Sequence, residues 1–570
     1  MAAQAEPITT AGLRPELFAE PGALAPGRTA LIILLALMVL AGLWLRAAGL
    51  GAEALSEDEL NKLEAVADYR ANGLTAANGE HPFLMKALQT VSIMAAEKWN
   101  GSSLVASRPA EFGISTEAAL RIPSILFGSL AVIVLYLFTL ELFGGEVALM
   151  AAALWAFDPT AIGFNRIAKE DTFVLFFFLL ANVFWLKSQR VAESGKGNPE
   201  PLYWATAAAY GAMMASKYVP HLFAVSISYN YIFQGIPEAR WRLGKKRFFI
   251  FFAVMGLVFL VLNPTILLPA TWRQMLAFAS YKRIGHDGYE FMGRVYSHKL
   301  MDWLYGVPWY FYFVFMWVKL PVLTILSFLA GLPVVIRKRV GDGRFFLFFW
   351  VLIGFIPFMF FGGKFTRYFT PVLPVVLIVA GLGLQRASRF VTGPLSANEG
   401  VKASLRAALY GLVILASGVT SLMAAPHYRL YTNSFGGGAE RAGSFFPQDE
   451  FYDAAIRDTV AEIARRARPG ARVATETVGL AAYYGERAGR ADLHFISLSD
   501  HAALSEMTEG DFLIAERGRR YFSNEALLAR LGQSVRPAFR IYAGEVQAAD
   551  VYLLDQSSLA IVRSSMGAAK

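Results

Sequence analysis

Three consecutive acidic residues follow the first long apolar run of the chain, in the sequence Leu55-Ser56-Glu57-Asp58-Glu59-Leu60. Ser56 and Glu59 have the spacing of a capping box, in which two side chains bond the exposed amides at the start of a helix. This structural role explains the acids as well as a functional role does. A cap does not require Asp58, however, and a carboxylate beside a membrane surface is well placed to act as a general base. Asp58 and Glu59 are therefore the candidate catalytic residues.

The same polar loop continues with Asn78-Gly79-Glu80-His81-Pro82-Phe83-Leu84-Met85-Lys86. We expect the proline to end one segment and to start an amphipathic helix that lies at the membrane interface. A single histidine in a loop is most often only a polar residue. In one loop with Asp58, however, His81, Glu80 and Lys86 form a constellation of charged and polar groups, and they are candidates for substrate contact.

Charged residues also mark the ends of later apolar runs. Arg166 and Asp171 lie five residues apart at the start of one run, where ionisable groups are costly and often functional, although snorkelling of the side chains to water is the usual alternative. Lys217, Lys364 and Arg367 stand at further helix ends that we expect on the same membrane face. A guanidinium holds two phosphate oxygens at once, so this set of cations suits a phosphate-bearing lipid.

The composition indicates a membrane protein. Of the 570 residues, 55% are hydrophobic, and the mean hydropathy is +0.43. A net charge of +9 would also fit nucleic-acid binding, but the basic residues lie in short loops between apolar runs, as the positive-inside rule describes. We therefore expect contact with membrane lipids and no nucleic-acid partner. The chain has no cysteine, which excludes disulfides and thiolate chemistry.

The apolar runs predict a polytopic α-helical membrane protein with about 11 transmembrane helices, because one crossing needs about 20 mainly apolar residues. Several runs are short and need flanking residues to complete the crossing. The runs are residues 31–50, 122–143, 147–162, 173–185, 203–214, 219–233, 248–268, 309–336, 345–361, 369–384 and 405–423.

Lysine and arginine in the connecting loops predict the orientation. With eleven crossings and an internal N-terminus, the most basic loops all fall on one side, which is the cytoplasm by the positive-inside rule. These loops contain Lys187, Arg190, Lys196, Arg240, Arg242, Lys245, Lys246, Arg247, Arg337, Lys338, Arg339, Arg344, Arg386, Arg389, Lys402 and Arg406. We predict a cytoplasmic segment 1–28, a transmembrane catalytic domain 29–424 with external loops 51–121 and 269–308, and an extracytoplasmic domain 425–570.

The C-terminal segment differs in character from the rest of the chain. Charges and turn residues return after about residue 425, and helix-like and strand-like stretches alternate. Residues 451–466 read as a helix, whereas residues 473–477, 512–515 and 551–554 read as strands. This pattern predicts a small α/β domain outside the membrane.

These motifs resemble those of glycosyltransferase family 39, the dolichyl- and polyprenyl-phosphate-mannose protein O-mannosyltransferases of the GT-C class, which also includes the aminoarabinose transferases of lipid A. Asp58-Glu59 and the run from Glu80 to Lys86 are similar to the Asp-Glu and His-Pro-Pro-Leu-Gly-Lys signatures of that family. Further similarities cover residues 30–440 in order. They are Arg121 with Ser124 and Gly128, Asp158, the spacing of Arg166 and Asp171, Ser216-Lys217-Tyr218, His286 to Gly293, Trp309-Tyr310, Lys319-Leu320-Pro321 and Tyr428 to Gly438.

The resemblance implies a GT-C fold and a polyprenyl-phosphate sugar as the donor. The phosphate is already a good leaving group, so one base is enough, unlike the two carboxylates of glycoside hydrolysis. The resemblance implies Asp58 as this base with inversion at the anomeric carbon, and Glu59 and Glu80 as residues that shape the site or contact the acceptor. No cofactor is required, and a divalent metal is possible without being implied. The candidates for donor and substrate binding are His81, Lys86, Arg166, Asp171, Lys217, Lys364 and Arg367, with Asp171 holding Arg166.

The acceptor is left open between a protein Ser/Thr hydroxyl and a lipid A-like or envelope glycolipid. An oligosaccharyltransferase would want a Trp-Trp-Asp motif, and the sequence has no Trp-Trp pair. Two other classes are a non-catalytic subunit of a membrane complex and a transporter, although a transporter would place charges at mid-membrane in broken helices. A dimer or larger complex is also open. The expected location is the bacterial inner membrane, with several crossings, a cytoplasmic N-terminus and a periplasmic active site and C-terminal domain.

Overall fold

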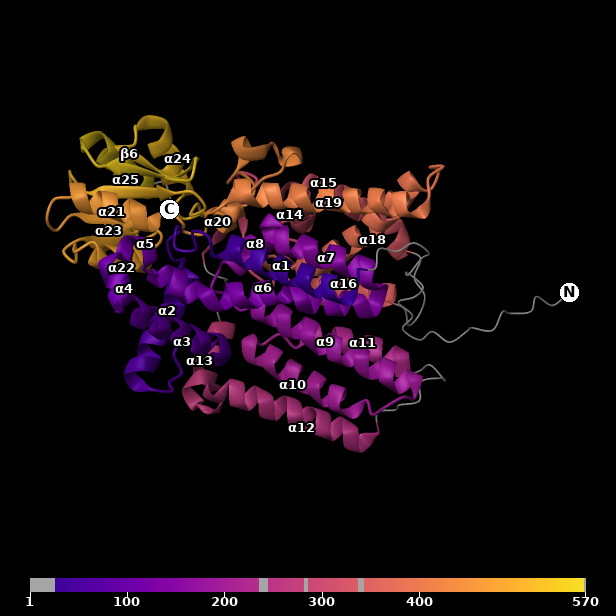
Figure 1. Ribbon diagram of the computed structural model, residues 1–570. Helices are drawn as coiled ribbons and strands as arrows, with labels where there is room; N and C mark the ends of the chain where they lie inside the picture. Colours follow the sequence, from indigo (N-terminus) through magenta and orange to yellow (C-terminus); the bar gives the residue numbers. More distant parts are fainter. Residues whose placement is uncertain (1–25, 235–243, 281–285, 337–342, 568–570) are drawn as a thin grey trace.

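The computed structural model describes residues 26–234, 244–280, 286–336 and 343–567. Figure 1 shows a bundle of long helices joined at one end to a smaller α/β domain. Because the described residues begin at residue 26, the predicted cytoplasmic segment 1–28 lies almost entirely outside them. The predicted fold class, a polytopic helical membrane protein with a C-terminal α/β domain, is confirmed.

Six helices in the described ranges are long and apolar enough to cross a membrane, and a bent pair makes a seventh if it is one span. The bent pair is α7 (Gly145–Phe157) and α8 (Pro159–Asn165), which meet at an angle of 61°. The six are α1 (Arg28–Ala47), α6 (Thr116–Phe143) preceded by α5 (Pro109–Phe112), α9 (Asp171–Ser194), α16 (Gly343–Gly354) continued by α17 (Ile356–Phe360), α18 (Leu373–Thr392) and α19 (Glu399–Ala424).

Shorter apolar helices complete the bundle. They are α10 (Glu200–Ser216), α11 (His221–Gln234), α12 (Lys245–Leu262), α14 (Phe311–Lys319) and α15 (Val322–Ile336). Each of the eleven predicted apolar runs coincides with at least one helix of the bundle. Helices are the expected form of these runs, because lipid offers the backbone no hydrogen-bond partner. The chain is thus a multi-pass membrane protein, and the count of eleven crossings stays a prediction.

Two facing glycines allow the closest helix pair of the bundle to form. A Cβ atom on Gly331 of α15 would lie 2.0 Å from the carbonyl oxygen of Val379 on α18. A Cβ atom on Gly383 of α18 would lie 1.8 Å from the carbonyl oxygen of Ser327. Small residues let transmembrane helices approach backbone to backbone, which increases van der Waals contact where no hydrophobic force drives association.

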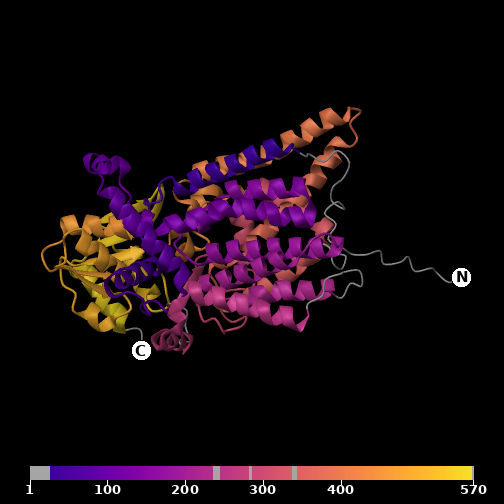
Figure 2. The ribbon, with the colours of Figure 1, turned by 60° about the horizontal axis from the view of Figure 1, so that its bottom comes forward.

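The segments between the helices gather at the end of the bundle that carries the α/β domain (Figures 1 and 2). They are α2 (Glu57–Asn72), α3 (Phe83–Asn100), α4 (Ser103–Ser107), the 3-10 turn η2 (Pro264–Leu267), α13 (Pro269–Ser280), the antiparallel hairpin of β1 (Gly288–Phe291) and β2 (Arg294–Ser297), and the 3-10 turn η3 (Thr366–Phe369). The two predicted external loops and the C-terminal domain therefore share one end of the molecule.

The C-terminal domain contains a five-stranded sheet in the order β4-β3-β5-β7-β6. Strand β3 pairs in parallel with β4 and β5, whereas β7 pairs antiparallel with β5 and β6. The strands are β3 (Arg472–Thr475), β4 (His494–Ser497), β5 (Phe512–Glu516), β6 (Phe539–Ala543) and β7 (Val546–Leu553). The helices are α20 (Pro447–Phe451), α21 (Ile456–Arg466), α22 (Val478–Arg487), α23 (His501–Ser505), α24 (Glu525–Ser534) and α25 (Gln556–Gly567), and three 3-10 turns lead into them, η4 (Tyr428–Leu430), η5 (Ser434–Gly436) and η6 (Gly438–Arg441).

The α/β domain shares an apolar core with the first external loop. Leu60 and Val66 of α2 are buried in one cluster with Val473 of β3, Leu480 of α22 and Ile514 of β5. The burial of apolar area is the main force that holds two segments together. The domain is therefore packed directly onto the helix that carries the candidate catalytic residues.

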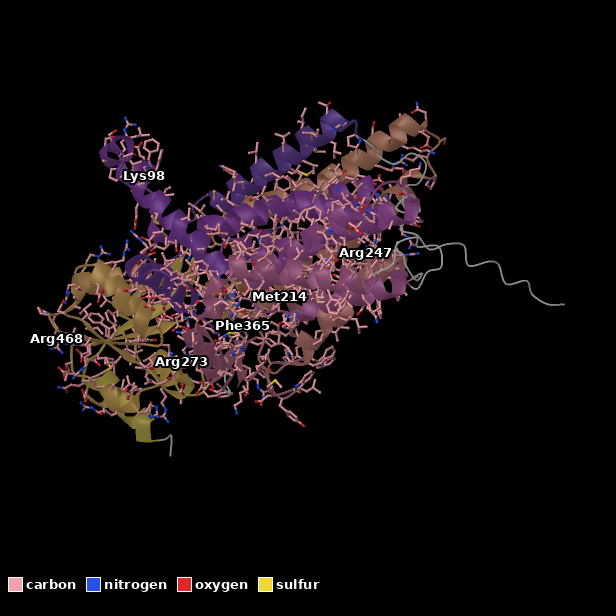
Figure 3. All side chains as sticks on the ribbon, turned by 90° about the horizontal axis from the view of Figure 1, so that it is seen from below. Lys98, Met214, Arg247, Arg273, Phe365 and Arg468 are labelled. Atoms are coloured by element: carbon pink, nitrogen blue, oxygen red, sulfur yellow. The ribbon has the colours of Figure 1, made fainter. Side chains whose placement is uncertain are left out.

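The basic loops lie at the opposite end of the bundle. Figure 3 places Arg247 at that end, far from Lys98 and from Arg468 of the C-terminal domain. Among the predicted basic residues, Arg240, Arg242, Arg337, Lys338 and Arg339 lie outside the described residues. The separation of the two ends agrees with the predicted topology, and the assignment of the basic end to the cytoplasm stays a prediction.

Candidate active site

A cavity of about 820 Å³ lies where the helical bundle meets the C-terminal domain. Its walls come from α2, the His81 loop, the turn before α9, α13, η3 and the C-terminal domain. Phe365, which lines the cavity, is labelled in Figure 3 near the junction of the two parts. The cavity therefore collects residues from nearly the whole length of the chain.

The acidic run forms the predicted helix cap and also places one acid at the cavity. Ser56 and Glu59 form the predicted capping box at the start of α2, with Ser56 N donating to Glu59 at 3.0 Å and Glu59 N donating to Ser56 at 3.3 Å. Asp58 takes no part in the cap, and its side chain, 34% exposed, faces the cavity. The cap thus fixes the helix end that presents Asp58.

Three arginines hold the irregular segment between α1 and α2 by its backbone. They donate to eight carbonyl oxygens between residues 46 and 54, and we call this arrangement the arginine cradle. The pairs are Arg166 with the carbonyls of Arg46, Ala48 and Gly49, Arg121 with those of Leu50, Glu53 and Ala54, and Arg457 with those of Gly51 and Ala52. The structure thus places Arg166 against the backbone rather than in the cavity wall.

Glu59 is buried behind the cavity and anchors the cradle. Its carboxylate accepts two hydrogen bonds from Arg121, at 2.8 and 2.7 Å, and one from the amide of Ala168 at 2.9 Å. Burial would raise the pKa of Glu59, but the charge and hydrogen bonds of Arg121 outweigh burial and lower it. Glu59 therefore joins α2, α6 and the turn before α9, and it acts on the cavity only through these contacts.

Asp58 lies among three donors from distant parts of the chain. Its Oδ2 atom is 2.8 Å from Lys169 Nζ, 3.6 Å from a terminal nitrogen of Arg367, and 2.9 Å from the hydroxyl of Tyr452, which donates to it. Burial alone would raise the pKa of Asp58, but Lys169, followed by Arg367, holds this pKa well below its usual range. Asp58 is therefore ionised at every physiological pH.

Lys169 and Glu170, in the turn before α9, pair with α2 and with the His81 loop. Lys169 pairs with Asp58 of α2. Glu170 is 2.8 Å from Lys62 Nζ, also on α2, and 3.3 Å from His81 Nδ1. Burial lowers the pKa of His81 well below its usual value, so the ring is neutral where it faces the cavity. The turn thus sets the relative positions of α2 and the His81 loop.

Asp171 pairs with Lys217 and not with Arg166. Its carboxylate is 2.7 Å from Lys217 Nζ, and Lys217 lines the cavity with Tyr218. Arg166 lies instead in the arginine cradle, because the carbonyls at the end of α1 are nearer to it than any carboxylate. The predicted contact between Asp171 and Arg166 is therefore replaced by one between Asp171 and a cavity cation.

Lys86 and Lys364 are both used to hold loops. Lys86 Nζ donates to three carbonyls of the His81 loop, and burial lowers the pKa of Lys86 to about 7. Lys364 is fully buried and donates to the carbonyls of Val307 and Phe361. Neither lysine lines the cavity. Glu80, by contrast, does line it and accepts a hydrogen bond from Asn78 at 2.6 Å.

The C-terminal domain contributes residues that the sequence motifs did not single out. Tyr452 and Asp453 adopt left-handed backbone conformations, with φ of 48° and 63°. Such conformations are costly for residues other than glycine and cluster at functional sites. Arg519 lines the cavity, donates to both oxygens of Asp453, and lies 2.6 Å from Glu57 at the start of α2. Its Nη1 atom is also 2.9 Å from the ring of His286.

The cavity therefore unites only part of the predicted set. Asp58, Glu80, His81, Lys217 and Arg367 line it. Behind the wall lie Glu59, Lys86 and Asp171, whereas Arg166 and Lys364 bond the backbone elsewhere. Sequence reasoning missed Lys169, Glu170, Tyr452 and Arg519, although two adjacent charges at positions 169 and 170, next to an apolar run, were a visible signal for the first pair. In the described ranges, no group of three or more histidines or acids is placed to hold a metal ion.

Comparison with known families gives one match within the chain. Residues 111–267 match the family model described as dolichyl-phosphate-mannose-protein mannosyltransferase. The matched segment contains Lys169, Asp171 and Lys217 of the site. A search of curated protein sequences gave no match.

Three solved structures are similar to the whole chain at low sequence identity. ArnT from Cupriavidus metallidurans, bound to undecaprenyl phosphate, has a TM-score of 0.48 at 14% identity and covers 92% of this chain and 98% of its own. The oligosaccharyltransferase of Archaeoglobus fulgidus with a tethered acceptor peptide has a TM-score of 0.48 at 12% identity, over 85% of this chain and 69% of its own. The arabinofuranosyltransferase AftD from Mycobacteria has a TM-score of 0.42 at 11% identity, over 93% of this chain and 40% of its own.

The resemblance that the motifs indicated is confirmed by the family match. The matched residues run as far as η2 and include Lys169 and Lys217, whereas Asp58 of α2 and Arg367 of η3 lie outside the match. Over residues 111–267 this multi-pass membrane protein is thus similar to the dolichyl-phosphate-mannose-protein mannosyltransferases.

Proposed function

We propose that the chain transfers a hexosyl group, mannose or a related sugar, from a polyprenyl-phosphate carrier to a Ser/Thr hydroxyl of an extracytoplasmic protein. One observation carries the proposal: the partly exposed carboxylate of Asp58 lies among cations in a cavity of about 820 Å³. The description of the matching family, a dolichyl-phosphate-mannose-protein mannosyltransferase, supports both the type of donor and the protein acceptor.

The donor phosphate binds the cations that face the cavity. Lys217 and Arg367 come from the sequence prediction, and Lys169 joins them from the turn before α9. Charge-assisted hydrogen bonds from these groups stabilise the negative charge that builds on the phosphate as the sugar departs. Arg166, which the sequence suggested for this role, instead positions the segment that leads to Asp58.

The reaction needs a single base. The acceptor oxygen forms a bond to the anomeric carbon from the face opposite the phosphate, while the bond from that carbon to the phosphate oxygen breaks. Asp58 takes the acceptor proton, and the polyprenyl phosphate leaves with the bonding electron pair. The configuration at the anomeric carbon is inverted. Glu80, on the same cavity wall as Asp58, contacts the acceptor, and Glu59 supports the base through α2.

An Asp58→Asn variant tests the proposal. A general base contributes about 10²–10⁴-fold to a rate, so we expect transfer to fall by at least about 100-fold. The purified variant should still unfold cooperatively in detergent, because Asp58 forms no part of the helix cap, but at a lower temperature, because Lys169 and Arg367 lose their paired acid. The matched control is Asp68→Asn on the same helix, outside the cavity, which should retain transfer.

Mass spectrometry of envelope proteins and lipids provides the readout. Cells that lack the protein are complemented with the native chain, with D58N or with D68N. We expect hexose on Ser/Thr peptides only in the first and third strains. Hexose that instead appears on an envelope glycolipid would replace the proposed acceptor, and wild-type transfer by D58N would remove Asp58 from its role.

A further inference from the structure

We propose that the donor phosphate and Asp58 compete for the same two cations, so that donor binding releases the base from its ion pairs. This inference rests on the proposed function and adds a coupling between the two substrates. In the ground state of the enzyme, the base is then held by the groups that later hold the leaving group.

The first observation is the geometry at Asp58 Oδ2. The same oxygen lies 2.8 Å from Lys169 Nζ and 3.6 Å from the Arg367 guanidinium. The two cations come from different elements, the turn before α9 and η3, and both line the cavity beside Asp58. A phosphate that enters between them therefore takes over contacts that Asp58 makes in the free protein.

The second observation is the unused bonding capacity of the two cations. Lys169 is buried, with a side chain 7% exposed, and among the described residues Asp58 is its only acid within ion-pair distance. An ammonium group has three donors, so most of its capacity is open. Arg367 lies above the ring of Phe365 at 4.0 Å, and its contact with Asp58 is long for a charge-assisted bond. Both cations can therefore exchange partners.

The other charges near Asp58 are committed elsewhere. Lys62 of α2 pairs with Glu170 at 2.8 Å, and Lys217 pairs with Asp171 at 2.7 Å. Tyr452 donates a neutral hydrogen bond, which persists when the cations leave. Only Lys169 and Arg367 thus exchange Asp58 for the phosphate. After the exchange, Tyr452 still orients the carboxylate of Asp58, but no cation neutralises its charge.

The consequence is an ordered reaction. A carboxylate paired with two cations is a weak base, because the proton it would accept is repelled by the same charges. Once a phosphate carries a negative charge to the cations, the carboxylate becomes more basic while the leaving group is stabilised. Donor binding therefore precedes acceptor deprotonation, and an acceptor bound without donor meets an inactive base.

Binding of farnesyl phosphate, a short polyprenyl phosphate, tests the exchange. The full-length chain in detergent is titrated at pH 7 by isothermal calorimetry. We expect Asp58→Asn to bind this probe about three- to tenfold more tightly than the native chain, because both cations lose their competitor. Lys169→Met should bind it at least about tenfold more weakly, and the milder K169Q serves if K169M unfolds at a lower temperature.

Two controls separate the exchange from a general charge effect. Glu64→Gln removes another acid that lines the cavity from α2, and the affinity for the probe should not change. In Lys98→Met, a change on the outer part of α3, the affinity should also equal that of the native chain. Equal tightening by E64Q and D58N would overturn the inference, because the cavity would then respond only to its net charge.

The outcomes distinguish the inference from the proposed function. Probe binding by the native chain with no gain in D58N overturns the exchange and leaves a phosphate donor in place. No binding by any variant overturns the phosphate donor and the exchange together. Tighter binding in D58N with weaker binding in K169M supports both.

Discussion

Two of the cations near Asp58 are each paired with an acid of their own. Lys62 is held by Glu170 and Lys217 by Asp171. Burial of an unpaired charge would cost several kcal/mol, and pairing within a small volume avoids that cost. At this scale the site is a set of ion pairs between residues of different elements, and only Lys169 and Arg367 pair with the base itself.

A Tyr452→Phe variant tests the role of Tyr452 as a positioning residue. The hydroxyl donates to Asp58 Oδ2 at 2.9 Å, so its loss should let the carboxylate rotate away from the acceptor. We expect kcat to fall by about tenfold, consistent with about 1.4 kcal/mol of lost positioning, while KM for the donor stays unchanged. Steady-state kinetics with thermal unfolding as the control check this, and a rise in KM alone would contradict it.

The sequence identified the residues whose neighbours along the chain form a motif. Asp58 and His81 were found in this way, and both line the cavity. Tyr452 and Arg519 lie almost 400 residues or more from Asp58 and have no local signal. A position near a membrane face does not show whether an arginine reaches the cavity or a helix end. The sequence therefore suggested Arg166 for the phosphate, whereas in the structure Arg166 donates to carbonyls.

At the scale of elements, one short turn sets the distances between the parts of the site. In the turn before α9, Lys169 contacts α2 and Glu170 contacts the His81 loop, and Asp171, the first residue of α9, contacts Lys217 at the end of α10. Successive side chains here point in different directions, so three adjacent residues can contact different elements. The turn itself is held by the amide of Ala168, which donates to Glu59.

The packing of α15 against α18 can be tested with Gly383→Ala. The new Cβ atom would lie 1.8 Å from the carbonyl oxygen of Ser327, so the helices must separate. We expect a loss of roughly 1–3 kcal/mol in the free energy of unfolding, as for other overpacked sites. Gly411→Ala on α19, where nothing lies within 4 Å, is the matched control and should not destabilise. Equal unfolding temperatures of the two variants in detergent would contradict the proposed packing.

The positions of the helices were easier to predict from the sequence than which helices cross the membrane. Long apolar runs fix where a helix forms, and each of the eleven runs coincides with a helix. Length and composition do not decide how a short helix such as α11 or α14 crosses a bilayer, since its neighbours supply the rest of the thickness. The bend of 61° between α7 and α8 was also hidden in one continuous apolar run, although the proline after Asp158 marks its position.

For the whole molecule, the C-terminal domain belongs to the site rather than standing apart from it. It shares an apolar core with α2, supplies Tyr452 to the base, and places Arg519 between Asp453 and Glu57. A truncation that removes residues 440–570 would therefore remove part of the cavity wall. Such a truncation would affect acceptor binding and catalysis together. Sequence patterns predicted this domain as an α/β unit but not its contacts, which depend on the folded chain.

The acids at the domain junction predict how stability changes with pH. Burial, followed by the charge of Asp453, raises the pKa of Glu516 to about 8. The folded protein then binds one more proton than the unfolded chain between about pH 4.5 and 8. The contribution of Glu516 to stability is therefore greatest below this window and is lost as pH rises through it.

A Glu516→Gln variant should reduce this pH dependence, because the amide does not titrate. The measurement is the unfolding temperature of the full chain in detergent from about pH 5 to 9. Glu509→Gln, in the turn before β5, is the control and should keep the native dependence. A slope in E516Q equal to that of the native protein would assign the effect to another group.

The arginine cradle has a consequence for how this chain tolerates insertions and deletions. Residues 48–54, between α1 and α2, form no helix or strand, and such connecting segments usually accept changes in length. Here eight carbonyls are matched one by one to three guanidinium groups from distant helices. One added or missing residue would shift every carbonyl oxygen past its donor and move Asp58 along the cavity wall. The number of residues between the end of α1 and Asp58 is therefore as constrained as it would be within a helix.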